Sequence, residues 1–264
     1  MSVQFFLGSH RPNWLATAGV PLFVSHRTLR EYRTLPRAIA PWALDSGGFT
    51  EINLHGEWRT TPGEYVAAVR RYRDEIGLLE WASPQDWMNE PIVLKRTGLT
   101  VQQHQLLTVE NYLRLRNMDA DLPFVPVLQG WEPDDYLRCA DIYEAAGVDL
   151  TAEKVVGVGT VCRRQDTSTA DLIFTRLAAR GISLHGFGIK VDGLRRYAHA
   201  LVSADSMAWS AEARWIAAKR PEGARLPTCG KKTCANCLHY ALAWRSRPLA
   251  ALASPQQLTL EMSA

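Results

Sequence analysis

The sequence has little cysteine and no long apolar run. Five cysteines in 264 residues are too few and too unevenly placed for the disulfide framework of a small secreted protein. No apolar segment approaches the roughly 20 residues that span a bilayer, and Met1-Ser2-Val3-Gln4 has no basic run leading into an apolar stretch. The chain also lacks internal repeats and low-complexity segments. These absences argue against a disulfide scaffold and a membrane partner, and we expect a soluble, cytoplasmic protein.

Positive charge is concentrated towards the C-terminal end. Between Arg214 and Arg247, eight Lys and Arg residues stand against Glu222 alone, so this stretch carries +7 while the whole chain carries +3. A basic block beside a mildly acidic body suits a face that binds a polyanion such as nucleic acid. The alternative interpretation is a solvated surface helix and loop.

Short apolar runs alternate with stretches of helical spacing along the chain. The eight expected strands are Gln4–Gly8, Pro21–Ser25, Trp42–Asp45, Leu78–Ser83, Phe124–Gln129, Val155–Thr160, Leu184–Lys190 and Leu201–Asp205. The clearest helices are Pro62–Ile76, Val101–Asn117, Pro133–Ala146, Thr169–Arg180 and Ser210–Arg220, several of which open with Pro or a Ser/Thr cap. This alternation predicts an α/β fold, a (β/α)8 TIM-type barrel, with an open doubly wound sheet as the alternative.

The composition favours one catalytic domain with a small addition. A chain of this length with 47% hydrophobic content can bury one sizeable core, and barrels often reach this size undivided. We expect the barrel over residues 1–222, a zinc-binding module packed on it over 223–247, and a helix or tail over 248–264.

Polar residues follow six of the expected strands. In a barrel of this kind the chemistry lies at the C-terminal strand ends. The segments found there are Asp45-Ser46-Gly47-Gly48-Phe49, Ser83-Pro84-Gln85-Asp86-Trp87, Gln129-Gly130-Trp131, Gly157-Val158-Gly159-Thr160, His185-Gly186-Phe187-Gly188-Ile189-Lys190 and Ser203-Ala204-Asp205-Ser206. Three carboxylates, an amide and several glycines therefore converge on one mouth.

Two of these carboxylates suit chemistry at a sugar carbon. One of a pair placed across a pocket can attack the anomeric carbon while the other handles the proton of the leaving group, and Asp45 and Asp205 are placed for this. Taken singly, the Asp45 run can be a plain turn and Asp205 a helix cap. Their position at strand ends favours the functional interpretation.

The other polar residues describe a pocket for a guanine-like base. Glycines let the backbone approach a planar ligand, and Phe49 or Trp87 can stack on it. Asp86 and Gln129 can read its polar edge, as an acceptor and as a mixed donor and acceptor. The duller alternatives are a helix cap for Asp86 and a surface amide for Gln129.

Three motifs resemble a known superfamily. Asp45-Ser46-Gly47-Gly48-Phe49, Leu128-Gln129-Gly130 and Ala204-Asp205-Ser206 resemble those of the tRNA-guanine transglycosylases in order and approximate spacing. Within that superfamily, the segments 156–164 and 185–190 are most similar to the DNA-modifying branch, the DpdA family, which exchanges guanine in DNA for a 7-deazaguanine. The resemblance covers Phe5 to His239.

The resemblance implies roles for individual residues. Asp205 would be the nucleophile that forms a covalent aspartyl–sugar intermediate, and Asp45 the general acid/base. Phe49 would stack on the base while Asp86, in a looser match, and Gln129 bind its edge. The other base-binding positions that it implies are Ser46, Gly47, Gly48, Gly130, Gly157, Gly159, His185 and Gly186. His185 stands where the tRNA enzymes have an apolar residue, so its role stays open.

The clustered cysteines predict a metal site. Cys229, Cys234, Cys237 and His239 offer three thiolates and an imidazole within eleven residues, enough for one structural Zn²⁺ per chain. tRNA-modifying relatives have a closer first cysteine pair and a more distant histidine, so His199 is the alternative fourth ligand. An iron–sulfur cluster would need a further cysteine. The remaining alternative is reduced core cysteines, which is our interpretation of Cys139.

Six basic residues are candidate phosphate contacts. They are Arg163, Arg164, Arg195, Arg196, Lys231 and Lys232. Solvated helix starts are the alternative interpretation of the arginine pairs.

These observations predict a transglycosylase that replaces guanine in DNA with a base such as 7-cyano- or 7-aminomethyl-7-deazaguanine. Its partners would be DNA, the incoming base and accessory modification proteins, and a target base within a duplex would have to be flipped out. The alternatives are a tRNA-guanine transglycosylase, a nucleosidase with water as acceptor, and a zinc-stapled non-catalytic barrel that binds nucleic acid.

Overall fold

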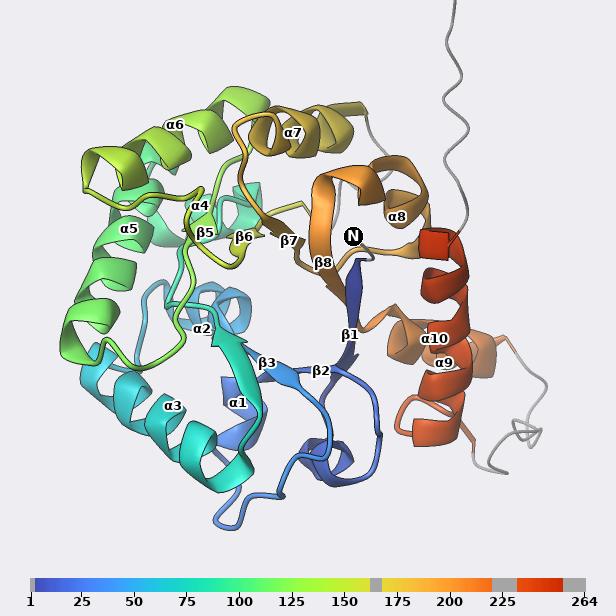
Figure 1. The fold of residues 1–264 in the computed structure, drawn as a ribbon. Coiled ribbons are helices and arrows are strands. Elements are labelled where there is room, and N and C mark those ends of the chain that lie inside the picture. The colour runs from blue at the N-terminus through green and yellow to red at the C-terminus, as the bar shows by residue number, and fades with distance from the viewer. Residues whose placement is uncertain (1–2, 162–167, 220–231, 254–264) are drawn as a thin grey trace, which may run out of the picture.

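The computed structural model describes residues 3–161, 168–219 and 232–253. Eight parallel strands form one curled sheet surrounded by helices (Figure 1). The strands are β1 (Gln4–Ser9), β2 (Leu22–Ser25), β3 (Trp42–Asp45), β4 (Leu79–Ala82), β5 (Val127–Leu128), β6 (Val156–Val158), β7 (Leu184–Gly186) and β8 (Leu201–Ser206). The helices are η1 (Pro12–Ala16), α1 (His26–Leu29), α2 (Gly48–His55), α3 (Pro62–Ile76), α4 (Pro91–Thr97), α5 (Val101–Met118), α6 (Pro133–Ala145), α7 (Ser168–Ala178), α8 (Val191–Tyr197), η2 (Ala198–Ala200), α9 (Ala208–Ala218) and α10 (Leu238–Ala253).

The strand order follows the chain around the sheet. It runs β4-β3-β2-β1-β8-β7-β6-β5, which is not the order of a doubly wound sheet. The two edges meet where Ala82 of β4 bridges Phe124 in parallel, because the Ala82 N–H donates to Pro123 O at 2.9 Å and the Val125 N–H donates to Ala82 O at 3.1 Å. The α/β prediction is confirmed, and the arrangement is consistent with a TIM-type barrel.

Helix starts were readable because their caps are local. The Thr61 side chain accepts a hydrogen bond from the Glu64 N–H while the Thr61 N–H donates to the Glu64 carboxylate, forming a capping box in front of Pro62. Thr100 and Gln103 form the same arrangement at the start of α5. The predicted helix Pro62–Ile76 is confirmed at both ends.

Several elements differ from the predicted ones. The strands expected over Phe124–Gln129 and Leu184–Lys190 are reduced to β5 and β7, because their flanking residues leave the sheet as loops. Helix α2 begins at Gly48, the second glycine of the pair, and was missed. Helix α10 runs across the expected boundary at residue 247, with Pro248 inside it, and packs against α8, α9 and β1.

Two apolar layers result from the alternation of side chains along the strands. Phe5 of β1 joins the large core between the sheet and the helices. Phe6 points to the other side and joins Trp81, with Phe23 and Phe187 packed against them, in a small aromatic cluster inside the curled sheet. Phe23 and Phe187 of this cluster also line the cavity of the candidate site. None of the described helices is long and apolar enough to cross a membrane.

Candidate functional site

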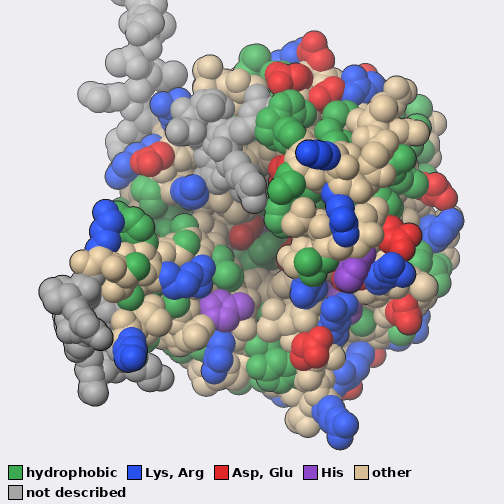
Figure 2. Space-filling model, turned by 180° about the vertical axis from the view of Figure 1, so that it is seen from behind, with side chains coloured by type: hydrophobic (Ala, Val, Ile, Leu, Met, Phe, Trp, Pro, Cys, Tyr) green, Lys and Arg blue, Asp and Glu red, His purple; other side chains and the backbone are tan. Residues whose placement is uncertain are grey.

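A cavity of about 460 Å³ opens where the strands end, a size typical of small-molecule sites. Its lining residues lie on or just after all eight strands and include most of the predicted polar groups. They are Gly8, Ser9, His10, Phe23, Ser25, Arg27, Thr28, Asp45, Gly47, Gly48, Phe49, Thr50, Ser83, Asp86, Met88, Glu90, Gln129, Gly159, Thr160, Phe187, Gly188, Asp205 and Met207. Figure 2 shows a hollow near the middle of the face opposite to that of Figure 1, with acidic side chains at its bottom and basic ones around it.

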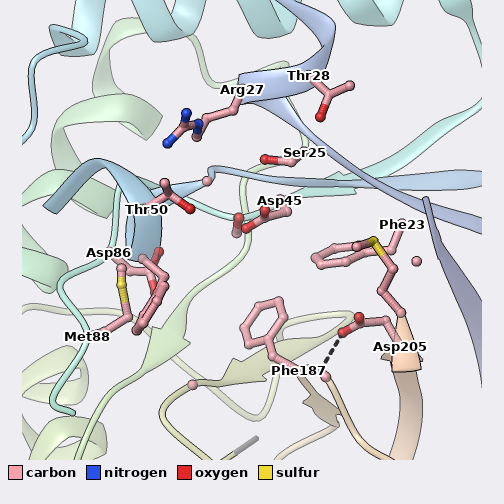
Figure 3. Close-up of a pocket in the computed structure, with 18 of the residues that line it drawn as sticks. Phe23, Ser25, Arg27, Thr28, Asp45, Thr50, Asp86, Met88, Phe187 and Asp205 are labelled. Atoms are coloured by element: carbon pink, nitrogen blue, oxygen red, sulfur yellow. Dashed lines mark hydrogen bonds between the residues drawn. The ribbon is translucent and has the colours of Figure 1, made fainter. Parts of the chain in front are cut away.

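Asp45 stands at the end of β3, on the wall of the cavity (Figure 3). It accepts hydrogen bonds from the Gly47 N–H and from Ser25, its neighbour across the β2–β3 pair. Loss of solvent raises the pKa of Asp45 above its usual value, these two hydrogen bonds oppose the rise, and the charge of Asp205 adds to it. Burial therefore makes the protonated form of Asp45 easier to reach than that of an exposed aspartate.

Asp205 reaches the same cavity from the end of β8. It is 5% exposed, and its Oδ1 accepts a hydrogen bond from the Gly188 N–H at 2.8 Å, drawn in Figure 3. Nε2 of His185 lies 3.4 Å from the same oxygen. Asp205 thus presents a carboxylate whose orientation is fixed by neighbouring groups.

His185 lies below the cavity rather than on its wall. Its ring is fully buried at 4.7 Å from the centroid of Trp81 and 4.9 Å from that of Phe187. Nδ1 pairs with the Ser203 hydroxyl at 2.8 Å, in register across β7 and β8. The structure therefore places His185 behind Asp205, whereas we predicted it among the base-binding residues.

Asp86 and Gln129 form a connected polar pair. The Gln129 amide N–H donates to Asp86 Oδ2 at 2.5 Å, and the Ser46 hydroxyl donates to Oδ1 at 3.2 Å. The Thr160 hydroxyl donates to Gln129 Oε1 at 2.7 Å. Burial raises the pKa of Asp86 to about 7, the Gln129 hydrogen bond opposes this, and the charge of Asp45 adds to it. Ser46 accordingly supports the pair from behind the wall.

Two of the predicted glycines are needed for close approach. A Cβ on Gly159 would stand 2.2 Å from Gln129 Nε2, so only glycine leaves room for that amide. Gly47 has φ of +79°, in the left-handed region that favours glycine. Gly48 lines the cavity as predicted.

Three other predicted glycines face packed protein instead of the cavity. A Cβ would meet Asp135 at Gly130, Phe187 at Gly157 and Ile189 at Gly186. None of the three is among the described lining residues. Their role in this structure is close packing.

Of the two aromatic residues predicted to stack on a base, one lines the cavity and the other does not. Phe49 lines the cavity and packs on the cluster of Ile52, Met88 and Val93. Trp87 lies outside the lining and meets the ring of His104 edge-on, with centroids 5.3 Å apart. Phe49 is therefore the aromatic residue of this pair that a bound base could contact.

Sequence reasoning missed Arg27, Thr28 and Glu90, which line the cavity, and it named Thr160 only as the last residue of the segment Gly157-Val158-Gly159-Thr160. A sequence signal did exist for Arg27 and Thr28, because they lie within three residues of the end of β2 and the rule about strand ends applies there too. Thr160 had none. Its φ of +57° is unusual for a threonine and turns the hydroxyl towards Gln129.

The predicted phosphate contacts are less complete. Arg163, Arg164 and Lys231 lie outside the described residues. Arg195 and Arg196 are exposed in the last turn of α8, and neither lines the cavity. Lys232 is exposed ahead of the cysteine turn.

The cysteine segment is held against the barrel. The Cys237 N–H donates to Cys234 O at 3.0 Å, which places the two residues on one tight turn, as a Cys-x2-Cys pair of metal ligands requires. The Ser210 hydroxyl donates to Ala235 O at 3.1 Å, and Asn236 bonds to His10 at the cavity rim.

The remaining zinc ligands are not assembled in the part of the chain that the structure describes. Cys229 lies outside it, and His239 and His199 are both exposed, on α10 and on η2. Among the described residues no three His, Cys, Asp or Glu side chains form a metal-binding group. The cysteine pair fits half of a tetrahedral site, and the zinc stays a prediction.

Comparison with known proteins identifies a family and, at low sequence identity, solved structures that include two aldolases. A family model described as DpdA, DeoxyPurine in DNA protein A, matches residues 1–260. No curated protein matches the chain. The YdjI aldolase from Escherichia coli K12 is 10% identical, with a TM-score of 0.47 and coverage of 97% of this chain and 93% of that one. A putative fructose-1,6-biphosphate aldolase from Coccidioides immitis is 8% identical, with a TM-score of 0.49 and coverage of 95% and 92%.

Proposed function

The chain belongs to the DpdA family, DeoxyPurine in DNA protein A, and on that basis we propose that it is a transglycosylase that exchanges guanine in DNA for a 7-deazaguanine. The observation that carries the proposal is that Asp45 and Asp205 both line one cavity, in different surroundings. The family description indicates a purine in DNA as the substrate. The two carboxylates indicate the type of reaction, a base exchange at a sugar carbon.

In the first half-reaction Asp205 attacks C1′ of the deoxyribose. The C1′–N9 bond breaks as the bond to the Asp205 oxygen forms, and the electron pair leaves with guanine. Asp45, whose raised pKa favours the protonated form, gives its proton to the departing base. The products are free guanine and an aspartyl–sugar ester on an otherwise intact strand.

The second half-reaction reverses these steps with the incoming base. Asp45, now ionised, removes the N9 proton of the 7-deazaguanine, and N9 attacks C1′. The ester bond breaks and the electron pair returns to Asp205. Asp45 is protonated again, so the protein ends as it began.

Asp86 and Gln129 are proposed to hold both bases in turn. When ionised, Asp86 accepts hydrogen bonds from guanine N–H groups, and the Gln129 amide can serve as donor and acceptor on the same edge. Phe49 offers a ring for stacking. The Asp86 and Gln129 side chains are already joined by a hydrogen bond of 2.5 Å. Little of their conformational freedom therefore remains to be lost when a base binds.

The proposed zinc has a structural role. Cys229, Cys234, Cys237 and His239 would hold one ion, and its effect would be to fix the cysteine turn on which Asn236 contacts His10 at the cavity rim. No step of the exchange involves it.

Trapping the covalent intermediate tests the proposed reaction. Incubation with guanine-containing DNA and no incoming base should give a protein–DNA adduct on a denaturing gel. Asp205→Asn should bind the same DNA and form no adduct. Base release into water without an adduct would favour a nucleosidase, and an adduct formed by Asp205→Asn would overturn the choice of nucleophile.

A further inference from the structure

Arg27 is a cationic side chain on the cavity wall, and no hydrogen bond or ion pair joins it to the described part of the chain. It follows β2 on the short helix α1 and lines the cavity beside Ser25 and Thr28. Its Nη1 is buried and makes no hydrogen bond. A buried guanidinium nitrogen without a partner is costly. Such a group is expected where a ligand supplies the missing acceptor.

The stem of Arg27 is held in place by the backbone of the Asp45 motif. A Cβ on Gly47 would stand 2.7 Å from Arg27 Cγ and 3.1 Å from Cδ, so the stem lies directly on this glycine. Figure 3 shows the guanidinium extended from α1 over the side of the cavity where Thr50 lies. Gly47, in the run Asp45-Ser46-Gly47-Gly48, therefore leaves the space that the Arg27 stem occupies.

Acidic groups outnumber basic ones on the cavity wall. Four carboxyl groups line it, those of Asp45, Asp86, Glu90 and Asp205, and Arg27 is the one Lys or Arg among the described lining residues. Arg30, one turn further on, already pairs with Glu31 and Glu51, each at 3.4 Å. A strand with a negative charge at every linkage enters this cavity against repulsion unless a cation receives it.

We propose that Arg27 is a phosphate subsite that binds the phosphodiester next to the target nucleotide. The inference rests on the proposed function, because it takes the substrate to be a nucleic acid. A guanidinium binds a phosphate through two parallel N–H···O bonds, and this contact would fix the register of the strand and so the sugar that faces Asp205.

The test uses short single-stranded oligodeoxynucleotides with one guanine, each with an uncharged methylphosphonate at a single linkage. Affinity is measured by fluorescence anisotropy with the full-length protein. The native protein should lose about tenfold in affinity when one linkage beside the guanine is neutralised, as expected for a charge-assisted hydrogen bond. Arg27→Gln should lose about tenfold on the fully charged strand and nothing further at that linkage.

Arg33→Gln is the matched control, because it removes the same charge from an exposed position outside the cavity. It should keep the native discrimination between linkages. If Arg27→Gln still discriminates at that linkage, or the native protein discriminates at none, the subsite is wrong. Discrimination through Arg27 without any base exchange would instead refute the proposed function alone, and failure to bind any strand would refute both.

Discussion

Nε2 of His185 lies 3.4 Å from Oδ1 of Asp205, and Nδ1 of the same ring pairs with the Ser203 hydroxyl at 2.8 Å. If the serine donates to Nδ1, the ring proton is on Nε2, which makes no hydrogen bond within the described part of the chain and lies 3.4 Å from the carboxylate oxygen. Ser203 and His185 then form a chain behind Asp205, within an aromatic cluster that keeps water away. We infer that this chain helps to position the carboxylate that the proposed reaction uses as the nucleophile.

His185→Leu should slow the attack while leaving base binding intact. The substitution fills the cluster with an apolar side chain of similar size but removes the ring nitrogen that faces Asp205. We expect the rate of adduct formation to fall about threefold to tenfold, because Asp205 loses a polar neighbour 3.4 Å from its Oδ1, with an unchanged KM for the incoming base. Ser203→Ala should change the same rate in the same direction by less, and His185→Gln should restore part of it. An adduct rate equal to that of the native protein in His185→Leu would show that the histidine only fills space.

Asp86→Asn should stabilise the protein more at high pH than at low pH. Burial raises the pKa of Asp86 to about 7, so ionisation is opposed in the folded state. Stability associated with the neutral carboxyl is present below the unfolded value near 4 and is lost as pH rises to about 7. Three pKa units correspond to at most about 4 kcal/mol. Denaturant unfolding of both proteins at about pH 5 and pH 8 measures the difference.

Asp149 provides the control of opposite sign. Hydrogen bonds from the Thr151 hydroxyl and backbone lower its pKa, so Asp149→Asn should lose stability above the unfolded pKa rather than gain it. If Asp86→Asn shows no gain between the two pH values, Asp86 does not carry a raised pKa.

Gly159→Ala should weaken binding of the base. The added methyl would stand 2.2 Å from Gln129 Nε2 and would displace the amide that links Asp86 to Thr160. We expect KM for the incoming base to rise at least about tenfold, since a buried pair would lose its geometry. Gly63→Ala is the matched control, because its nearest neighbour would be Met118 Cε at 3.7 Å. A normal KM in Gly159→Ala would show that the pair does not touch the base.

Purified protein should contain about one zinc per chain by elemental analysis. Cys234→Ser should lose the metal, since the cysteine turn provides two of the expected ligands. Cys139→Ala should keep it, because Cys139 is fully buried on α6 and burial raises the pKa of its thiol to about 12. Native protein without zinc would remove the metal site from the account.

The sequence predicted most where the determinants are local. The capping box at Thr61 and the polar run after Trp42–Asp45 are each written in consecutive residues, and both elements have the predicted ends. The rule about strand ends brought Asp45, Asp86, Gln129 and Asp205 to one cavity. These predictions needed only the alternation of strand-like and helix-like segments and the common direction of parallel strands.

What the sequence could not provide depends on contacts between distant strands. His185 faces into the sheet because of its register with Ser203, and no local pattern tells an inward histidine from one on the wall. Thr160 reaches Gln129 through an unusual φ. The place of Arg27 on Gly47 depends on how α1 and the end of β3 meet.

The central claim is tested most directly by offering the protein guanine-containing DNA and tRNA separately, each with 7-cyano-7-deazaguanine. Both polymers are then digested to nucleosides and analysed by mass spectrometry. The account predicts a deazaguanine deoxynucleoside from DNA with the native protein, none with Asp205→Asn, and none from tRNA. Modification of tRNA alone, or of neither polymer, would contradict it.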